Sequence, residues 1–334
     1  MSALRFGLIG TGRIGRVHAA NIAESADAEL AVVADPFIDG ATSIADRFGG
    51  TASSSADAVF APGVVDAVLI ASPTPTHVDL IERAVDAGLP VLCEKPIDLD
   101  IARVDALRER VAASDVPVAL GFNRRFDAAF AEVQRRVAAG EIGELEQLSI
   151  ISRDPAAPTA DYIAVSGGVF RDMTIHDFDM ARFFLPNIVS VSATASAVFD
   201  EGAAQHGDYD TAVVTLRAAS GATVSITNSR RAVYGYDQRL EAFGSAGMLQ
   251  VANAPSSLVT SFTGEAVETA SPYPPFFLER YAQAYRSELA AFIDAARGGA
   301  STPPTFEDGR AALLLADAAT ESAATGTTIA VDLS

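Results

Sequence analysis

The chain has a single cysteine, Cys93, among its 334 residues. One cysteine excludes an intramolecular disulfide, and such sparing use is typical of proteins that work in a reducing compartment. Cys93 ends an apolar stretch, Pro90–Cys93, that has the pattern of a strand. We therefore interpret it as a small core side chain and not as a nucleophile.

Basic residues are also scarce. The chain carries 24 lysines and arginines against 43 aspartates and glutamates, which gives a formal net charge of −19 at pH 7. Proteins that bind nucleic acid neutralise many phosphates with positive side chains. A chain with this balance is not expected to offer an extended phosphate-binding surface, so we do not expect a nucleic-acid partner.

Long apolar runs are missing as well. No stretch approaches the roughly 20 consecutive apolar residues that a membrane-spanning helix needs. The first residues also lack the basic segment, apolar segment and small-residue cleavage site of a secretory signal. We therefore expect a cytoplasmic protein without a membrane partner.

Apolar residues make up 49% of the chain, so a folded globular protein is expected. A length of 334 residues suits two domains better than one hydrophobic core. Near residue 122 the pattern changes from strands alternating with helices to strands that follow one another. We predict a first domain over residues 1–122 and a second over residues 123–334.

A glycine-rich motif follows the first predicted strand, Leu4–Ile9. It reads Gly10-Thr11-Gly12-Arg13-Ile14-Gly15, and Val17–Ala23 then has a helical pattern. In a dinucleotide-binding turn, the first glycine permits the tight turn, the second lets a pyrophosphate approach, and the third packs the helix on the strand. The helix N-terminus supplies the anion site. We predict that Gly10, Gly12, Arg13, Ile14 and Gly15 bind the cofactor.

An acidic residue ends the second predicted strand. Asp35 follows Leu30–Ala34 and lies about 20 residues after Gly15. A carboxylate at this point can bond the ribose hydroxyls of an adenosine, and it repels a 2′-phosphate. We therefore predict NAD as the cofactor, with NADP disfavoured.

Strands and helices continue to alternate up to residue 120, which predicts a parallel, doubly wound sheet. The further predicted elements are strands at Val65–Ala71, Pro90–Cys93 and Val116–Leu120, and helices that end near Phe48 and cover Val78–Ala87 and Ile101–Ala113.

Ligands of such sheets bind beyond the carboxyl ends of the strands. The segments in that place are Ser72–His77, Glu94-Lys95-Pro96 and Gly121–Arg125. We predict cofactor contacts from Ser72, Thr74, His77, Glu94 and Lys95. His77 could contact a ribose, or it could be a structural residue at a helix N-terminus.

Lys95 is the residue of this motif that could take part in the reaction. A lysine between Glu94 and Pro96 at a strand end can direct its ammonium into the ligand crevice. There it could hold and polarise a hydroxyl or carbonyl oxygen. The alternative is an ordinary solvated lysine.

A second chemical pattern lies beyond the glycine pair Gly167-Gly168. We predict a helix from about Asp172 to Leu185, because Pro186 cannot continue it. Asp172, His176 and Asp179 then project to one side. A carboxylate one turn from an imidazole can fix its tautomer and stabilise its cation, as a general acid/base requires. The same spacing also occurs on solvated acidic faces.

Strands dominate the second half of the chain. Turns at Ser220-Gly221 and Gly244–Gly247 join neighbouring strands as hairpins, so we predict a mostly antiparallel sheet. Val189–Ala195 alternates apolar residues with small hydroxyls, which indicates helices on one face and another cover on the second. A second subunit could provide that cover, so we predict a homo-oligomer. The predicted strands are Leu145–Arg153, Val189–Phe199, Thr211–Arg217, Ala222–Ser229, Arg239–Phe243, Met248–Val251 and Leu258–Phe262, and the helices are Ala128–Ala139, Phe277–Ala296 and Glu307–Ala323.

Taken together, the glycine loop with Asp35, the Glu94-Lys95-Pro96 motif and Asp172-x-x-x-His176 resemble the Gfo/Idh/MocA family of nicotinamide-dependent oxidoreductases. The resemblance covers essentially the whole chain, and the Glu-Lys-Pro motif is characteristic of that family. It implies an N-terminal Rossmann domain, of class α/β, followed by an α+β domain with an open-faced, mostly antiparallel sheet. It also implies a homo-oligomer, a tetramer in preference to a dimer.

Within the family, four segments resemble the inositol 2-dehydrogenases: Gly121–Asp127, Ser152–Pro155, Phe170–Asp177 and Tyr234–Asp237. This implies an enzyme that oxidises a cyclic polyol with NAD, myo-inositol to 2-keto-myo-inositol. Some family members carry histidine where this chain has Ser152 and methionine where it has Asn123. Another inositol isomer or an aldose is therefore the alternative substrate.

The resemblance also implies roles for single residues. Lys95 matches the lysine that contacts substrate and nicotinamide, Asp172 the aspartate that binds a substrate hydroxyl, and His176 the catalytic acid/base. Arg124 and Tyr236 match positions near the substrate, although Arg124 and Asp154 could equally form structural ion pairs. The predicted substrate-binding set is Lys95, Asn123, Arg124, Ser152, Asp154, Asp172, His176 and Tyr236.

Two functions of other classes stay open. A metal-dependent isomerase or aldolase could use Asp172, His176 and Asp179 as ligands, but the sequence has no other obvious ligand cluster, so we predict no metal. A dinucleotide fold can also serve as a sensor that binds NAD(H) without turnover.

Overall fold

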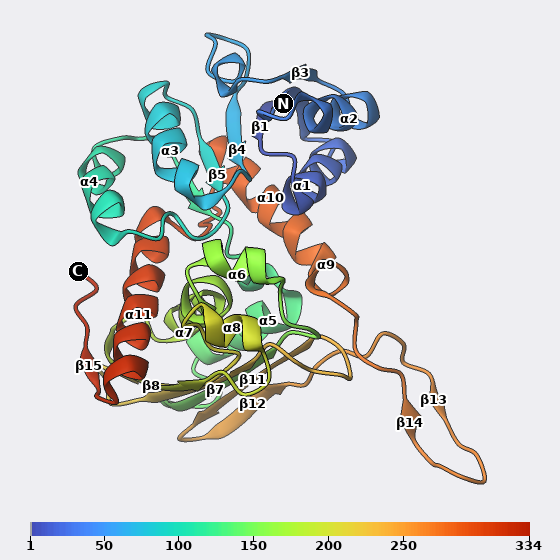
Figure 1. Ribbon diagram of the computed structural model, residues 1–334, viewed down its shortest axis with the longest axis vertical. Helices are drawn as coiled ribbons and strands as arrows, with labels where there is room; N and C mark the ends of the chain where they lie inside the picture. The colour runs from blue at the N-terminus through green and yellow to red at the C-terminus, as the bar shows by residue number, and fades with distance from the viewer. Residues whose placement is uncertain (1) are drawn as a thin grey trace. The chain divides into compact units, whose positions relative to one another are not determined.

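The computed structural model describes residues 2–334 and divides the chain into two compact units (Figure 1). The first unit runs to Asn123 and also takes in Gln283–Ala311, and the second consists of Arg124–Ala282 and Ala312–Ser334. The chain thus returns to the first unit after the second has begun. The predicted boundary at residue 122 did not include that return. Within residues 2–334, no helix is both long and apolar enough to cross a membrane.

A six-stranded parallel sheet forms the first unit, in the order β3-β2-β1-β4-β5-β6. From β1, the strands β2 and β3 extend the sheet to one side, and β4, β5 and β6 extend it to the other. This is the strand order of a doubly wound sheet, so the predicted Rossmann architecture is confirmed. The strands are β1 Leu4–Ile9, β2 Ala28–Ala34, β3 Thr51–Ser53, β4 Ala67–Ile70, β5 Val91–Cys93 and β6 Val118–Leu120. The helices between them are α1 Arg13–Glu24, α2 Ile38–Phe48, α3 His77–Asp86 and α4 Ile101–Ala112, with short 3-10 turns η1 Ala56–Ala58 and η2 Thr74–Thr76.

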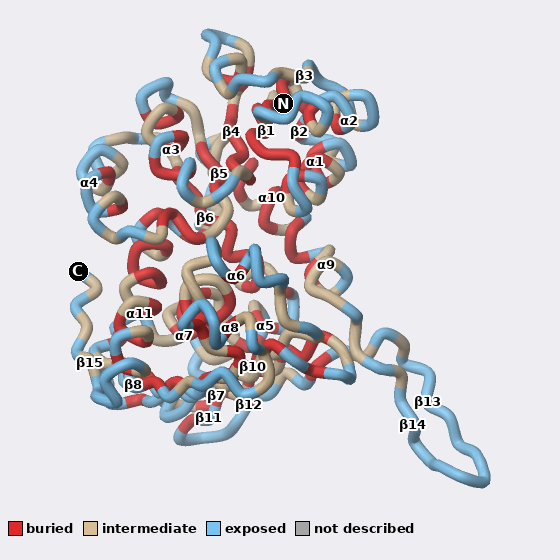
Figure 2. Tube along the Cα trace, in the orientation of Figure 1, coloured by how far each residue is buried: buried red, intermediate tan, exposed pale blue. Residues whose placement is uncertain are grey.

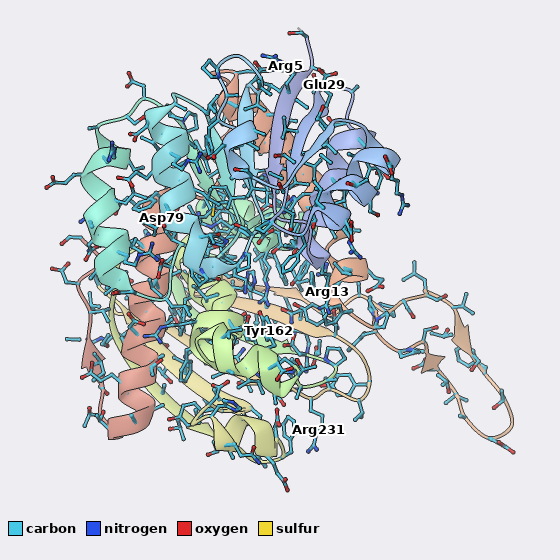
Figure 3. The ribbon with its side chains drawn as sticks, turned by 45° about the horizontal axis from the view of Figure 1, so that its top comes forward. Arg5, Arg13, Glu29, Asp79, Tyr162 and Arg231 are labelled. Carbon is cyan, nitrogen blue, oxygen red and sulfur yellow. The ribbon has the colours of Figure 1, made fainter. Side chains whose placement is uncertain are left out.

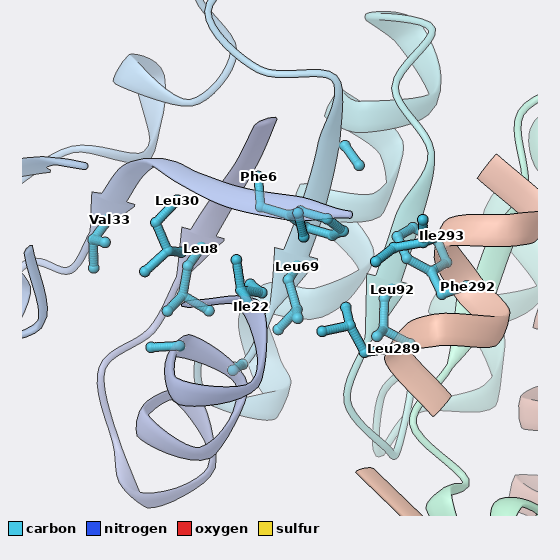
Figure 4. Packing of buried hydrophobic residues seen from close by; sticks show 14 of the residues in the cluster. Phe6, Leu8, Ile22, Leu30, Val33, Leu69, Leu92, Leu289, Phe292 and Ile293 are labelled. Carbon is cyan, nitrogen blue, oxygen red and sulfur yellow. The ribbon is translucent and has the colours of Figure 1, made fainter. Parts of the chain in front are cut away.

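A helix from late in the sequence completes the core of this unit. α10, Ala282–Ala296, places Leu289, Phe292 and Ile293 in the same cluster as β-strand residues such as Phe6 (Figure 4). The rings of Phe6 and Phe292 lie 6.0 Å apart between centroids. Because these contacts bury a full apolar face, α10 belongs to the first unit, although 277–296 had been assigned to the second domain as one helix. A separate short helix, α9 Phe277–Arg280, precedes it.

The second unit is built on a seven-stranded sheet in the order β12-β11-β7-β10-β9-β8-β15. β7 and β10 pair in parallel and the other neighbours are antiparallel, which confirms the mostly antiparallel sheet. The strands are β7 Leu145–Arg153, β8 Ile188–Ser196, β9 Thr211–Ala218, β10 Thr223–Ser229, β11 Asp237–Gly244, β12 Gly247–Val251 and β15 Ile329–Ala330. The remaining elements are α5 Ala128–Ala138, α6 Ala160–Ser166 and α8 Glu201–Gln205, together with η3 Asn123–Phe126 and α11 Phe306–Thr325, which belong to this unit from Arg124 and from Ala312 onward.

One face of this sheet is covered and the other is open. Along β9, Val214 and Leu216 are buried while the alternate residue Val213 is 49% exposed. α5 and α7, Ile175–Phe184, contact the strands on the covered side. A thin two-stranded arm, β13 Thr260–Ser261 and β14 Thr269–Ala270, is exposed along its length (Figure 2).

The predicted helix from Asp172 to Leu185 is in fact two elements. Phe170–Thr174, η4, forms a π-helical turn, and α7, Ile175–Phe184, continues it as an α-helix. Gly167 and Gly168 precede the turn with φ of 82° and 87°, a conformation that glycine adopts without strain. Sequence periodicity cannot separate a wide turn from an α-helical one. Such turns are frequent at functional sites.

A buried polar network anchors the start of α7. Asp177 is fully buried, and its carboxylate accepts hydrogen bonds from Arg124 Nη1 at 2.6 Å and from Asn228 Nδ2 at 2.8 Å. Thr174 donates in turn to Asn228 Oδ1 at 2.8 Å. Arg124 is itself 4% exposed, so the pair replaces two hydration shells with protein contacts. Four segments of the second unit, η3, η4, α7 and β10, are joined in this way.

Asp179, one turn further along α7, is held in the same manner. Its carboxylate is bound bidentately by Arg125, at 2.9 Å from Nε and 2.5 Å from Nη2. Asp179, which the sequence placed on one face with Asp172 and His176, is thus nearly fully buried in an ion pair. A buried carboxylate of this kind needs a cationic partner, and the arginine next to Arg124 provides it.

Replacing Arg124 by methionine should lower the free energy of unfolding by about 3–5 kcal/mol, because the Asp177 carboxylate would stay buried without its cation. Adding Asp177→Asn to that variant should recover part of the loss. Denaturant unfolding followed by circular dichroism measures both. Arg135→Met, which removes an exposed arginine of α5, is the control and should stay close to wild type. Losses at 124 and 177 that simply add would contradict the pairing.

Candidate active site

The glycine loop in the first unit has the geometry that a dinucleotide requires. A Cβ on Gly10, whose φ is +100°, would lie 2.4 Å from the Ser72 nitrogen, and one on Gly15 would lie 2.1 Å from the Gly10 oxygen. A Cβ on Gly12 would meet no atom within 4 Å. Gly12 also caps α1 without a side-chain hydrogen bond. The loop is therefore closed where the backbone packs and open where a pyrophosphate would approach the helix N-terminus.

Asp35 follows β2 and is tied to the glycine loop. Its Oδ2 accepts hydrogen bonds from the Thr11 backbone at 2.8 Å and the Thr11 hydroxyl at 2.7 Å, and its Oδ1 accepts from the Phe37 backbone at 2.8 Å. Burial opposes ionisation, but the three hydrogen bonds outweigh it and lower the pKa of the carboxyl. Asp35 is thus a carboxylate at neutral pH, the charge that bonds ribose hydroxyls and repels a 2′-phosphate.

The Glu94-Lys95-Pro96 motif follows β5 at the carboxyl edge of the same sheet. Glu94 donates its backbone N–H to Ile70 at 2.9 Å, and Gly121 donates to Cys93 at 2.7 Å, so the strand ends stay paired up to the motif. Lys95 is partly buried. The motif and the glycine loop both lie at the strand ends of one sheet, as the sequence predicted for cofactor contacts.

Ser72, Thr74 and His77 follow β4 at this edge. The Ser72 hydroxyl is hydrogen bonded to that of Thr76 at 2.6 Å, and Thr74 opens the turn η2. His77 is 1% exposed, and its two ring nitrogens each lie 2.8 Å from a backbone oxygen, those of Pro96 and Ser72. A ribose contact does not fit a buried ring with both nitrogens engaged. The structural alternative for His77 is the one that the structure supports.

In the second unit, Asp172 is held by two donors. Its Oδ1 accepts from the hydroxyl of Tyr162 at 2.7 Å, and its Oδ2 lies 3.4 Å from Arg230 Nη2. Tyr162 lies on α6 (Figure 3), and burial together with the charge of Asp172 raises the pKa of its hydroxyl, which therefore remains a donor. Arg230 is 1% exposed and also lies 3.6 Å from Asp208. Asp172 is thus oriented as a carboxylate on the π turn.

His176 is the second residue of α7 and follows Asp172 by one turn. The structure therefore keeps the predicted carboxylate and imidazole together on one junction of the second unit. A fixed carboxylate can accept a hydrogen bond from a substrate hydroxyl, and an imidazole can remove or return a proton.

Three further predicted residues come together in the buried network. Arg124 Nη2 lies 3.3 Å from the Ser152 hydroxyl and 3.4 Å from that of Tyr236. Burial alone would lower the pKa of Arg124, but Tyr236, Tyr281 and Asp177 outweigh it and raise that pKa. Burial raises the pKa of Tyr281 to about 12 and that of Tyr236 well above its usual range. The ion pair that the sequence left as an alternative for Arg124 is thus present.

The last two predicted substrate residues lie in different units. Asn123 is buried at the end of the first unit, and Asp154 follows β7 in the second, where its backbone N–H donates to Ser229 at 2.9 Å. Their contacts with substrate stay predictions.

The metal alternative named Asp172, His176 and Asp179 as ligands. Asp179 is bound bidentately by Arg125, as described above, so both of its oxygens already accept hydrogen bonds. Among residues 2–334, no group of three or more His, Cys, Asp or Glu side chains is arranged to hold a metal ion.

Sequence reasoning missed Tyr162, Arg230 and His18. Tyr162 and Arg230 lie 10 and 58 residues from Asp172, and His18 lies 76 residues from its partner Glu94. No local spacing pairs residues so far apart. The one available signal was that a partly buried carboxylate such as Asp172 needs hydrogen-bond donors, and this does not say which residues provide them.

Comparison with known proteins assigns the two units to one family. Residues 4–122 match the model of the Gfo/Idh/MocA oxidoreductase family with its NAD-binding Rossmann fold, and residues 130–250 match the C-terminal domain of that family. The chain is 49% identical to the inositol 2-dehydrogenase of Rhizobium meliloti, over 96% of this chain and 97% of that protein. It is 44% identical to the myo-inositol 2-dehydrogenase of Thermotoga maritima, over 96% of each.

A solved structure shows the same fold. The crystal structure of a myo-inositol dehydrogenase from Corynebacterium glutamicum superposes with a TM-score of 0.95 at 56% identity, covering 99% of each chain. Matches of this extent leave no part of either unit outside the common architecture. The chain therefore belongs to the Gfo/Idh/MocA family of NAD-dependent oxidoreductases.

Proposed function

We propose that this oxidoreductase converts myo-inositol to 2-keto-myo-inositol with NAD as the hydride acceptor. One observation carries the proposal. Asp172, oriented by Tyr162 and Arg230, lies one turn before His176 on a rigidly anchored junction. A carboxylate acceptor next to an imidazole suits a substrate with neighbouring hydroxyls. The names of the relatives at 44% to 49% identity support an inositol as that substrate.

The chemistry divides among three side chains. His176 takes the proton from the substrate hydroxyl, while the C–H bond on the same carbon gives up its hydride and the C–O bond becomes C=O. When bound, NAD supplies the hydride acceptor, and the products are the ketone, NADH and a proton. Asp172 accepts a hydrogen bond from an adjacent hydroxyl, and Lys95 stabilises negative charge that develops on the reacting oxygen. The mechanism requires one substrate molecule to reach Lys95 and His176 at the same time.

A second candidate is oxidation of another inositol isomer or of an aldose. Ser152 stands where some family members carry histidine, and here its hydroxyl is fully buried and accepts from Gln238 Nε2 at 2.9 Å. The serine side chain is smaller than the histidine side chain of those family members, and its hydroxyl is already hydrogen bonded, so the space left beside position 152 differs. Isomer choice is the property that this position should govern.

We also propose a cytoplasmic homo-oligomer, a tetramer in preference to a dimer. The outer face of the second unit's sheet exposes Val213, Phe243 and Met248 at 43% to 49%, and the arm exposes Leu258 at 91% and Phe262 at 65%. Apolar side chains gathered on an open sheet and an arm support association with other copies. The single, buried Cys93 suits a reducing compartment.

The function is tested by following NADH absorbance with purified protein, NAD and a panel of myo-inositol, scyllo-inositol, D-chiro-inositol, glucose, galactose and xylose. We expect turnover on myo-inositol with NAD and much less with NADP, because Asp35 is ionised. Activity confined to an aldose would show that the proposed substrate is wrong and that the proposed enzyme class is right. NADH binding without turnover on any polyol would favour the sensor.

Replacing His176 by alanine should lower kcat by roughly 10²–10⁴-fold, the usual contribution of a general acid/base, while NAD binding is retained. Steady-state kinetics and NADH fluorescence titration measure the two quantities. His206→Ala, which removes an exposed histidine of the same unit, is the matched control. Near-normal turnover of the His176 variant would remove the acid/base assignment.

Light scattering coupled to size exclusion should give the mass of four chains, and replacing Leu258 and Phe262 by serine should reduce it if the arm holds copies together. A mass of one chain for the unaltered protein would exclude the proposed oligomer.

A further inference from the structure

The residues on both sides of Lys95 are each hydrogen bonded to a buried histidine. Glu94 Oε1 lies 2.7 Å from His18 Nε2, and the Pro96 carbonyl oxygen lies 2.8 Å from His77 Nδ1. We propose that His18 and His77 are positioning residues that fix the backbone of Lys95 from both sides. The inference rests on the role of Lys95 in the proposed function.

His18 connects the motif to the helix of the glycine loop. It lies on α1, is 1% exposed, and meets the ring of Tyr285 edge-on with 5.7 Å between ring centroids. A carboxylate only accepts, so Nε2 carries the hydrogen of the bond to Glu94. His18 Nδ1 is buried and has no hydrogen-bond partner in the part of the chain that the structure describes. A hydrogen there would be unsatisfied, so the ring is held as the Nε2–H tautomer.

His77 connects the motif to the loop after β4. It is the first residue of α3, and its Nε2 lies 2.8 Å from the Ser72 carbonyl oxygen while Nδ1 faces Pro96. Both acceptors are carbonyl oxygens, so the ring nitrogen that faces each one can act toward it only as a donor. One side chain thereby fixes the spacing between two loops at the edge of the sheet.

The two contacts leave Lys95 little freedom except in its own side-chain torsions. The carboxylate before it is tied to α1 and the carbonyl after it to α3, and both helices pack on the parallel sheet. An ammonium that must meet a reacting oxygen loses rate steeply when it is displaced, by about 10²-fold for 1 Å. Two of the four histidines in the chain are used for this purpose.

Amide side chains distinguish the two nitrogen positions of each histidine ring. An asparagine places its NH₂ near the position of Nδ1, and a glutamine places it near that of Nε2. His77→Asn therefore keeps the bond to Pro96, and His77→Gln keeps only the bond to Ser72. At position 18 the order is reversed, because Glu94 is bonded through Nε2: His18→Gln keeps the bond and His18→Asn loses it.

We expect His77→Gln and His18→Asn to lower kcat by about 10–10²-fold with little change in the KM for NAD, whereas His77→Asn and His18→Gln stay within about threefold of wild type. Steady-state kinetics on the preferred polyol measures this, and thermal unfolding establishes that each pair of variants is equally folded. A purely structural role would make both amides at one position equally harmful. That result would overturn the proposal.

A second experiment tests whether the histidines act through Lys95, by combining their substitutions with one at Lys95. Lys95→Met alone should lower kcat strongly, and adding His77→Gln or His18→Asn should lower it no further, because the side chain to be positioned is already gone. A further drop would mean that the histidines act elsewhere. If Lys95→Met keeps near-normal turnover, the proposed role of Lys95 fails. If Lys95→Met is impaired while His77→Gln and His18→Asn are normal, the proposed function stands and the positioning role is overturned.

Discussion

The pairing of the Asp177 carboxylate with Arg124 is the interaction on which the second unit of this protein depends. A wholly buried carboxylate without its cation would cost several kcal/mol, so the pair and its extension through Asn228 and Thr174 permit one packing of α7 on the sheet. His176 lies in the same turn of helix as this anchor, and Asp172 lies just before it on the π turn. The position of the proposed acid/base is thus set by groups that do no chemistry themselves.

The first unit follows the same rule with different groups. The Asp35 carboxylate is satisfied by Thr11 and Phe37, which fixes the glycine loop and keeps a negative charge at the end of β2. Each unit therefore holds one set of polar groups in a single arrangement, and in the proposed function the first serves the dinucleotide and the second the hydroxyls of a polyol. Under that proposal, a common dinucleotide-binding unit can serve many substrates, because the substrate-facing groups belong to the other unit.

Much of the fold follows from local pattern. β1 and β7 were predicted with the bounds that they have, because short segments rich in apolar residues and followed by turn residues are typical of strands. The glycine loop and Asp35 were also predictable, since their roles depend on residues close in sequence. The return of α10 to the first unit was not, because an amphipathic helix does not show which core its apolar face will meet. The π turn, Tyr162, Arg230 and His18 were missed for the related reason that tertiary partners determine them.

A crystal structure of the protein with NAD and myo-inositol tests the central claim most directly, because it shows which side chains meet the reacting carbon. The account predicts that one hydroxyl lies within hydrogen-bond distance of both His176 and Lys95, that its neighbour is bonded to Asp172, and that the C–H bond faces C4 of the nicotinamide. A substrate bound with its reacting hydroxyl away from His176, or with Lys95 directed elsewhere, would contradict it.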